Sequence, residues 1–485
     1  MSRLLLLAVV AGLAALLATP PAIAADNTFA CLSPPTLTSA LPGDTKFPNQ
    51  DNFNCFAWQE FIALTWNSSY QTPGQPDPTA TAAQYGTPAS TTPLVWETFS
   101  PDGAVFKPAA LAPDPFGVTS PPACPELATG RNPGTLFANS ELVGVPISAL
   151  SSIVQAGTNY SWVTAQNHKP TYYDVRLNQP EYTYLVTNKF YDARNQGTAA
   201  VSTTQGVLLP NGAIEIKAAW LEITDQSRWP RYRMVQLPIL DTPTDSVTSV
   251  CRMAHMGLVA LHIIQKTPLG QQFVWASFEH VDNQPDYGAV DSTVDYTYYN
   301  QNCDPTTDHY HCDINHQPTC TPQGGGLLCD PVAAPVQVVK IVPTPASTVA
   351  LNDHVQNLIR QANPDSVFQY YRLVDSMWPN NNTVIPAGSM VSLTDGNAQP
   401  PLAQGGLLNP LIETYFQNSP NQNNGKGFLG CLSCHVAAPI AAQENPVRCT
   451  VQTGGGSNTP SRCASDYSFL FSKAQCPNPL ACQTQ

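Results

Sequence analysis

The chain has 485 residues, of which 34 are acidic and 21 basic, so its formal net charge is −13. Proteins that bind nucleic acid through a basic surface are therefore excluded. Hydrophobic residues make up 42% of the chain, which is enough for a substantial core and too many for a disordered protein. The 47 prolines argue against long uninterrupted helices, and the 14 cysteines indicate an oxidising compartment.

The first 24 residues have the three parts of a secretory signal peptide. A basic start with Arg3 is followed by an apolar run over residues 4–17, and an A-x-A sequence that ends at Ala24 offers a cleavage site. The run is too short to cross a membrane comfortably. The sequence therefore predicts a mature chain that begins near Ala25, is periplasmic or secreted, and has no membrane span.

A β-rich body is predicted over residues 25–345. It opens with a short amphipathic helix, because aromatic and aliphatic residues recur at helical spacing over residues 55–66. From about residue 140 onward, β-branched and aromatic residues favour strands. The clearest strands are expected at 182–187, 212–224 and 231–240, and a hairpin is expected over 254–280. Glu215 and Lys217 stand at alternate positions of one strand and indicate a solvated or pocket-lining face.

A linker over residues 331–345 leads into a segment that is predicted to be helical, residues 346–485. Asn352 is a suitable cap for the first helix of this segment. The expected helices run over residues 352–360, 364–377 and 409–417. The predicted fold class is therefore α+β, with a large β-rich, disulfide-stapled body followed by a C-terminal helical segment.

Twelve of the cysteines are expected to form six disulfides, which is the default in an exported chain. The four between residues 303 and 329 are expected to pair among themselves. The other expected pairs are Cys31 with Cys55, Cys124 with Cys251, Cys449 with Cys463, and Cys476 with Cys482. The loop at 300–330 also holds histidines and aspartates, residue types that bind zinc or calcium. Disulfides explain its cysteines better, because no known zinc spacing matches.

The two remaining cysteines stand in a C-x-x-C-H sequence formed by Cys431, Cys434 and His435. This spacing is typical of c-type haem attachment, since two thiols three positions apart reach the two vinyl groups on one edge of the porphyrin. A disulfide, a redox-active dithiol and half of a zinc site are the alternatives. Export favours haem, because c-type haem is attached outside the cytoplasm. We therefore expect one covalent haem c with His435 as the proximal ligand of its iron.

The sixth ligand of the iron has no downstream candidate, because no methionine or histidine follows His435. Upstream, Met390 lies in a loop-like stretch, and His262, His255 and Met256 lie in the predicted hairpin. Either one of these residues reaches the distal face of the haem, or the position is open or holds water. A six-coordinate iron favours electron transfer, whereas an open site binds oxygen, peroxide or another small ligand.

Several phrases of the sequence resemble those of a group of exported bacterial proteins labelled cytochrome c family proteins. Besides the C-x-x-C-H motif, they are FAWQEFIAL at 56–64, VWET at 95–98, GAIEIKAAW at 212–220, GLVALHIIQKTP at 257–268, WASFEHVDN at 275–283, YRLV at 371–374, ETY at 413–415 and SDYSFL at 465–470. The resemblance covers about residues 50–472 and implies one unit with a C-terminal haem. It also implies a distal-side place for His262. The loop at 300–330 has no counterpart in the group, which has no assigned reaction.

Together these features predict an exported monohaem c-type protein of periplasmic electron transfer, with haem carried by residues 346–485. Its partner would be a redox protein or a small-molecule substrate. The first alternative is a haem enzyme of the peroxidase, oxidase or oxygenase type, with a pocket between the β-rich body and the haem. The second is a binding protein in which haem is a sensor or a structural element. No catalytic residue is assigned by the sequence.

Overall fold

The computed structural model describes residues 28–44, 49–69, 71–118, 137–140, 152–154, 161–200, 207–242, 250–318, 320–323, 326–377, 390–391, 407–417, 430–435, 438–441 and 462–478. The predicted signal peptide lies outside these residues. In the part of the chain that is described, no helix has the length and apolar character needed to cross a membrane.

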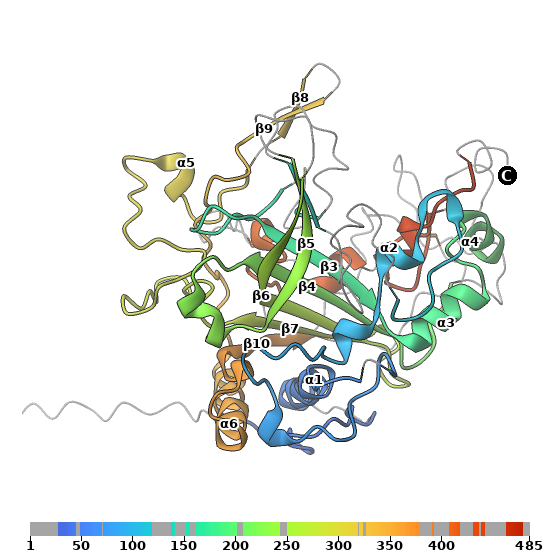
Figure 1. Cartoon of the computed structure of the whole chain (residues 1–485), viewed down its shortest axis with the longest axis horizontal. Coiled ribbons are helices and arrows are strands. Elements are labelled where there is room, and N and C mark those ends of the chain that lie inside the picture. The colour runs from blue at the N-terminus through green and yellow to red at the C-terminus, as the bar shows by residue number, and fades with distance from the viewer. Residues whose placement is uncertain are drawn as a thin grey trace, which may run out of the picture.

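An eight-stranded sheet forms the centre of the described structure (Figure 1). Its strands are β1 (Ser100–Pro101), β2 (Phe137–Ser140), β3 (Thr171–Leu177), β4 (Ile214–Glu222), β5 (Met234–Thr242), β6 (Val250–Gln265), β7 (Val274–His280) and β10 (Tyr371–Met377). The order is β1-β3-β4-β6-β5-β2, and β7 joins β6 to β10. All pairs are antiparallel except β2 with β5.

The long strand β6 organises this sheet. Its first half pairs with β5 and its second half with β7, while β4 runs along its other edge. β6 and β7 form the predicted hairpin, and β4 and β5 occupy most of two predicted strands. Every residue of β7 is buried, as expected for a strand that is covered on both faces.

Two helices, α1 (Gln50–Leu64) and α6 (Ala346–Ala362), cover one face of the sheet (Figure 1). α1 contains most of the predicted amphipathic helix and starts at the side-chain cap of Asn49. The rings of Trp58 and Phe61 pack on Phe278 of β7, with centroids 5.1 and 4.4 Å apart. These aromatic contacts help to hold α1 against the sheet.

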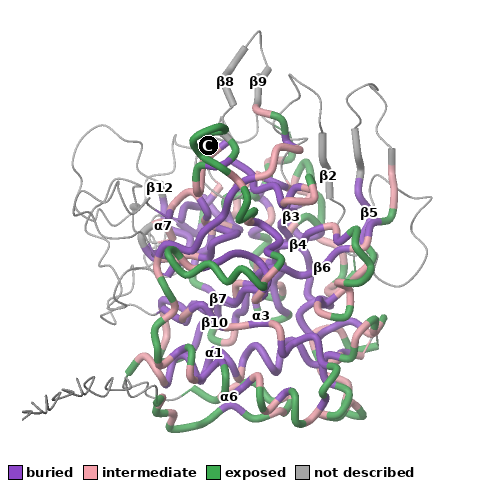
Figure 2. The backbone as a smooth tube through the Cα atoms, turned by 90° about the vertical axis from the view of Figure 1, so that its left-hand side faces the viewer, coloured by how far each residue is buried: buried purple, intermediate pink, exposed green. Residues whose placement is uncertain are grey.

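C-terminal segments cover the opposite face of the sheet. Figure 2 shows α7 (Cys431–His435) and β12 (Arg462–Cys463) on the side of the sheet away from α1 and α6. Hydrogen bonds attach residues 407–417 to this face. The Tyr173 hydroxyl donates to the Leu411 carbonyl at 2.6 Å, and the Asn409 amide donates to Ser277 Oγ at 2.9 Å. The sheet is therefore a buried middle layer.

The remaining elements are short. The other helices are α2 (Asp102–Val105), α3 (Gln179–Thr187), α4 (Ala193–Ala200) and α5 (His309–Cys312). Two further strand pairs are β8 (Cys320–Gln323) with β9 (Gly326–Cys329), and β11 (Met390–Val391) with β12. The 3-10 helices are η1 (Ala82–Gln84), η2 (Trp96–Thr98), η3 (Pro108–Ala110), η6 (Gln226–Arg231), η7 (Val367–Tyr370), η8 (Thr414–Phe416) and η9 (Phe469–Lys473).

Three predicted elements are wrong. Residues 182–187 belong to α3 rather than to a strand, because Asn178 caps the Glu181 amide and Pro180 stands in the first turn, both helix-start signals. Residues 364–377 are not a helix but η7 followed by β10, which completes the edge of β7. Residues 409–417 hold only the short η8. In addition, α6 begins after Pro345 instead of at residue 352.

The segment after residue 345 is consequently not wholly helical. Its strand β10 pairs with β7 of the body, from Tyr371 opposite His280 to Met377 opposite Trp275. Both sides of the predicted boundary thus contribute to one sheet.

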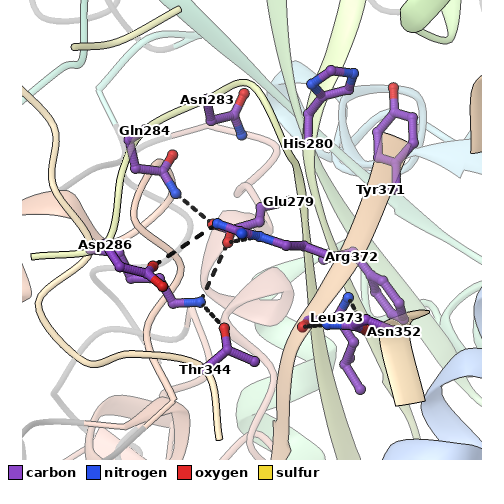
Figure 3. A network of polar contacts seen from close by, with 12 residues as sticks. Glu279, His280, Asn283, Gln284, Asp286, Thr344, Asn352, Tyr371, Arg372 and Leu373 are labelled. Atoms are coloured by element: carbon purple, nitrogen blue, oxygen red, sulfur yellow. Dashed lines mark hydrogen bonds and ion pairs between the residues drawn. The ribbon is translucent and has the colours of Figure 1, made fainter. Parts of the chain in front are cut away.

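A buried polar network strengthens the β7–β10 junction (Figure 3). Glu279 accepts hydrogen bonds from Arg372 Nε at 2.8 Å and from Gln284 Nε2 at 2.7 Å, and lies 3.4 Å from Lys340 Nζ. Burial raises the pKa of Glu279, but Lys340 and Arg372 outweigh it and leave this pKa below its usual value. The carboxylate is therefore charged and fully paired, as a buried ion must be.

Two disulfides are described in full. Cys31–Cys55 is a predicted pair, and Cys303–Cys312 joins two of the four cysteines that are expected to pair among themselves. Cys251, Cys463 and Cys476 are also disulfide-bonded, and their predicted partners lie outside the described residues. In β8 and β9, Cys320 stands opposite Cys329. These disulfides are compatible with an exported protein.

Candidate functional site

The C-x-x-C-H motif forms the short helix α7, which is held against the sheet by its neighbours. Leu432 is buried in a cluster that includes Trp275 of β7 and Ile440. The Ile440 amide donates to the Cys463 carbonyl at 3.0 Å, and Pro439 forms a β-bridge with Ala464. The motif is therefore fixed on the face that the C-terminal segments cover.

His435 is oriented by a backbone group and two aromatic rings. Its Nδ1 lies 2.8 Å from the Tyr467 carbonyl oxygen, so Nδ1–H donates and Nε2 is left for another partner. The ring contacts Trp275 and Phe469 edge-on, with centroids 4.5 and 4.9 Å away. Burial, opposed by the Tyr467 carbonyl, lowers the pKa of His435 to about 4. The side chain is thus a neutral imidazole with a fixed tautomer.

Cys431 and Cys434 form no disulfide, unlike the paired cysteines elsewhere in the chain. Both are partly exposed. Burial and then the nearby Glu413 carboxylate raise the pKa of each thiol. Redox-active dithiols usually have a thiol with a lowered pKa, which provides the reactive thiolate. The surroundings of Cys431 and Cys434 therefore do not favour a redox-active dithiol.

His262 of β6 lies on the same sheet face as the motif. It stands between Lys217 of β4 and Ser277 of β7 in the strand register. Its pKa is well below the usual value, because burial disfavours the charged ring and because the nearby Lys217 ammonium opposes a second positive charge. Its Nε2 lies 3.5 Å from a Glu413 carboxylate oxygen. Among the described residues, this Nε2 has no hydrogen-bond partner.

Lys217, His262 and Glu413 form a group of partly exposed side chains on an otherwise buried sheet face. Lys217 is partly exposed, although the residues before and after it in β4 are buried. His262 is likewise partly exposed between two buried residues of β6. Glu413 is also partly exposed, and burial raises its pKa to about 7 although Lys217 opposes the shift. The group therefore combines a basic, an imidazole and an acidic side chain near Cys431 and His435.

Sequence reasoning missed two members of this group. The sequence pattern indicates a solvated or pocket-lining face for Lys217 but does not link this residue to the motif, and it does not mark Glu413. A signal for Lys217 exists, because a lysine amid apolar residues of a predicted buried strand needs a polar environment. No local signal marks Glu413, whose place depends on how the chain returns over the sheet.

The other candidate ligands lie elsewhere or are described in part. Met390 is opposite Cys463 in the β11–β12 pair, which brings its backbone beside the segment that holds the motif. Its side chain is outside the described structure. His255 stacks on Trp229 with centroids 4.3 Å apart, and Met256 is buried in the core under α1. These two residues are therefore separate from the motif.

The described residues contain no group of three or more histidine, cysteine, aspartate or glutamate side chains that is arranged to hold a metal ion. In the loop at 300–330, Cys303 and Cys312 are joined in a disulfide and His311 Nδ1 lies 2.8 Å from Asp308. Comparisons with protein-family models, curated proteins and solved structures found no match to this chain. The functional argument therefore rests on the residues themselves.

Proposed function

We propose that this exported chain carries one haem c and transfers electrons through it. Cys431 and Cys434 would hold the porphyrin through thioether bonds, and His435 Nε2 would bind the iron. The haem would supply the redox-active metal, and the protein would supply its ligands, its burial and its exposed edge. The partner would be a redox protein outside the cytoplasm.

One observation carries this proposal: the orientation of His435. A histidine that binds a metal through Nε2 commonly donates Nδ1–H to a carbonyl, which fixes the tautomer and raises the basicity of the ligand. The bond from Nδ1 to the Tyr467 carbonyl is such a contact. It occurs next to two cysteines that are not in disulfides. The donor set therefore fits a c-type haem better than a disulfide or a zinc site.

We further propose that His262 lies on the distal side of the haem. Its Nε2 has no hydrogen-bond partner in the described structure and is close to the motif. A ligand atom of this kind would complete a six-coordinate iron, the state that suits electron transfer. Met390 remains the other proposed candidate.

A second function is favoured by one specific observation. Lys217, His262 and Glu413 form an ionisable group beside the motif, with Glu413 and His262 3.5 Å apart. Simple electron transfer does not require ionisable side chains of this kind, whereas proton transfer to a bound small molecule requires them. A haem enzyme of the peroxidase, oxidase or oxygenase type is therefore the alternative proposal.

Optical spectra of the protein matured with haem test both proposals. A covalent haem detected by mass, and lost in the Cys431→Ala/Cys434→Ala variant, is expected. If the matured chain holds no covalent haem, the proposed function is wrong. For electron transfer, the ferrous spectrum should be low-spin and unchanged by carbon monoxide. A high-spin spectrum that shifts with carbon monoxide would instead support the enzyme.

The ligand is tested by a matched pair of variants in one strand. His262→Ala should shift the visible spectrum and allow carbon monoxide to bind, because it would open the sixth position. His255→Ala should leave the spectrum unchanged, because His255 stacks on Trp229. Equal spectra for the two variants would show that His262 is not on the distal side of the haem.

A further inference from the structure

Two buried glutamates with few hydrogen bonds lie under the same C-terminal cover as the motif. Glu181 of α3 is 0% exposed and Glu215 of β4 is 7% exposed. Among the described residues, both carboxylate oxygens of Glu181 and Oε1 of Glu215 have no hydrogen-bond partner. An ionised carboxylate in such a place is costly, so it takes up a proton instead.

The charges that face this pair do not neutralise it. The third carboxylate, Asp466, forms an ion pair with Lys266 and accepts a hydrogen bond from the Leu209 amide at 2.7 Å. The positive charge of Lys266 is thus already balanced by Asp466. The other polar groups that act on the three carboxylates are Lys473, Tyr184 and Ser468. Lys473 lies at the surface, paired with Asp102.

The pKa directions agree with this geometry. Burial, followed by the charge of Glu215, raises the pKa of Glu181 well above its usual value. Burial raises the pKa of Glu215 to about 7, against an opposing hydrogen bond from Ser468. Burial also raises the pKa of Asp466 to about 6, although Lys266 opposes it. One proton held by the glutamate pair near neutral pH is therefore expected.

The pair lies close to the motif. In the strand register Glu215 is opposite Ile264, and Ile264 is opposite Trp275, whose ring contacts His435. Two strand spacings separate Glu215 from Trp275, which is about 10 Å. Asp466 is directly before Tyr467, whose carbonyl accepts from His435. At about 10 Å, one unit of charge changes proton affinity about tenfold in a protein interior.

We propose that Glu181 and Glu215 form a proton-binding site that is coupled to the redox state of the haem. This inference rests on the proposed function. When a donor protein gives one electron to the iron, the added negative charge would raise the proton affinity of the pair, which takes one proton from the solvent. When the electron leaves for an acceptor, the proton is released. No further reactant is required.

Redox titration of the haem protein at a series of pH values tests the coupling. The midpoint potential of the parent is expected to fall as the pH rises through about 7, because protonation accompanies reduction. Glu215→Gln and Glu181→Gln should each flatten this dependence. The control Glu222→Gln lies in the same strand but pairs with Arg252, and it should keep the dependence of the parent.

A potential that does not change with pH in the parent, or an unchanged slope in both glutamine variants, would overturn the coupling. Infrared spectroscopy separates this from a failure of the proposed function, because a protonated carboxyl has its own band whether or not haem is bound. A band that is present in the parent and lost in Glu181→Gln supports the proton site. If that band is present and no haem is attached, the proposed function and the coupling fail while the proton site stands.

Discussion

At the scale of single residues, His280 shows how burial fixes the charge of a side chain while backbone groups fix its tautomer. Its Nδ1 accepts the Asp282 amide at 3.1 Å, so its other nitrogen, Nε2, donates to the Arg231 carbonyl at 3.0 Å. The ring stacks on Tyr232, with centroids 3.9 Å apart. Burial lowers the pKa of His280 to about 4, although Asp282 opposes the shift. Protonation of Nδ1 would break the hydrogen bond that the Asp282 amide donates to it.

This arrangement predicts a pH dependence of stability. The unfolded histidine has a pKa of about 6.5, so between about pH 6.5 and pH 4 the unfolded chain binds more protons. The contribution of neutral His280 to the free energy of unfolding is therefore fully present above about pH 6.5. It is lost as the pH falls towards 4, by up to about 3 kcal/mol. The free energy of unfolding can be measured by urea denaturation at a series of pH values. In the His280→Gln variant, it should fall less steeply over this pH range than in the parent.

The control for this prediction is His354→Gln, since His354 is exposed on α6. Its pH profile should follow that of the parent. A His280→Gln profile with the full parent slope would show that the folded protein does not depress the proton affinity of His280.

At the scale of elements, one asparagine joins two helices and a strand. The side-chain oxygen of Asn352 in α6 accepts from Trp58 Nε1 of α1 at 2.9 Å and from the Leu373 amide of β10 at 3.0 Å. Its side-chain nitrogen donates to the Leu373 carbonyl at 2.9 Å. Asn352→Ala would leave three buried polar groups unpaired, so we expect a loss of about 2–4 kcal/mol in the free energy of unfolding.

Urea denaturation measures this loss, and Asn357→Ala provides the matched control. Asn357 is exposed on the same helix and bonds only to Arg360 in the described structure. Its replacement should change the free energy of unfolding by less than about 0.5 kcal/mol. Similar losses for the two variants would mean that helix propensity, rather than the buried bonds, explains the effect.

The elements that the sequence predicts well are those with a strong local pattern. α1 and the β6–β7 hairpin show clear periodicity. β10 does not, because its conformation is decided by the free edge of β7, which only the folded chain provides. The strand predicted at 182–187 failed because β-prone residues there follow a stronger helix start at Asn178.

The same contrast applies to the candidate site. The C-x-x-C-H motif is local and could be recognised directly. The position of Glu413 beside His262 depends on contacts between distant segments, such as that of Asn409 with Ser277. Patterns along the chain do not contain this information, so a polar group assembled over a sheet face cannot be predicted from one sequence.

At the scale of the whole molecule, the described parts share their core across residue 345. One cluster joins Leu177 and Trp275 of the sheet to Leu432 and Leu470 of the C-terminal segments. Another joins Tyr173 to Leu411. Because each side of the boundary covers apolar surface of the other, neither side buries its core alone. The described structure therefore predicts that both unfold together.

Calorimetry of the full chain should show a single unfolding transition, with equal calorimetric and van't Hoff enthalpies. Leu411→Ala should lower its midpoint without splitting it and cost about 2–5 kcal/mol, because Leu411 is fully buried between the two parts. The control Leu269→Ala, at an exposed turn, should have little effect. Two separate transitions, or a Leu411→Ala variant in which only the C-terminal part melts early, would mean that the cover unfolds as an independent unit.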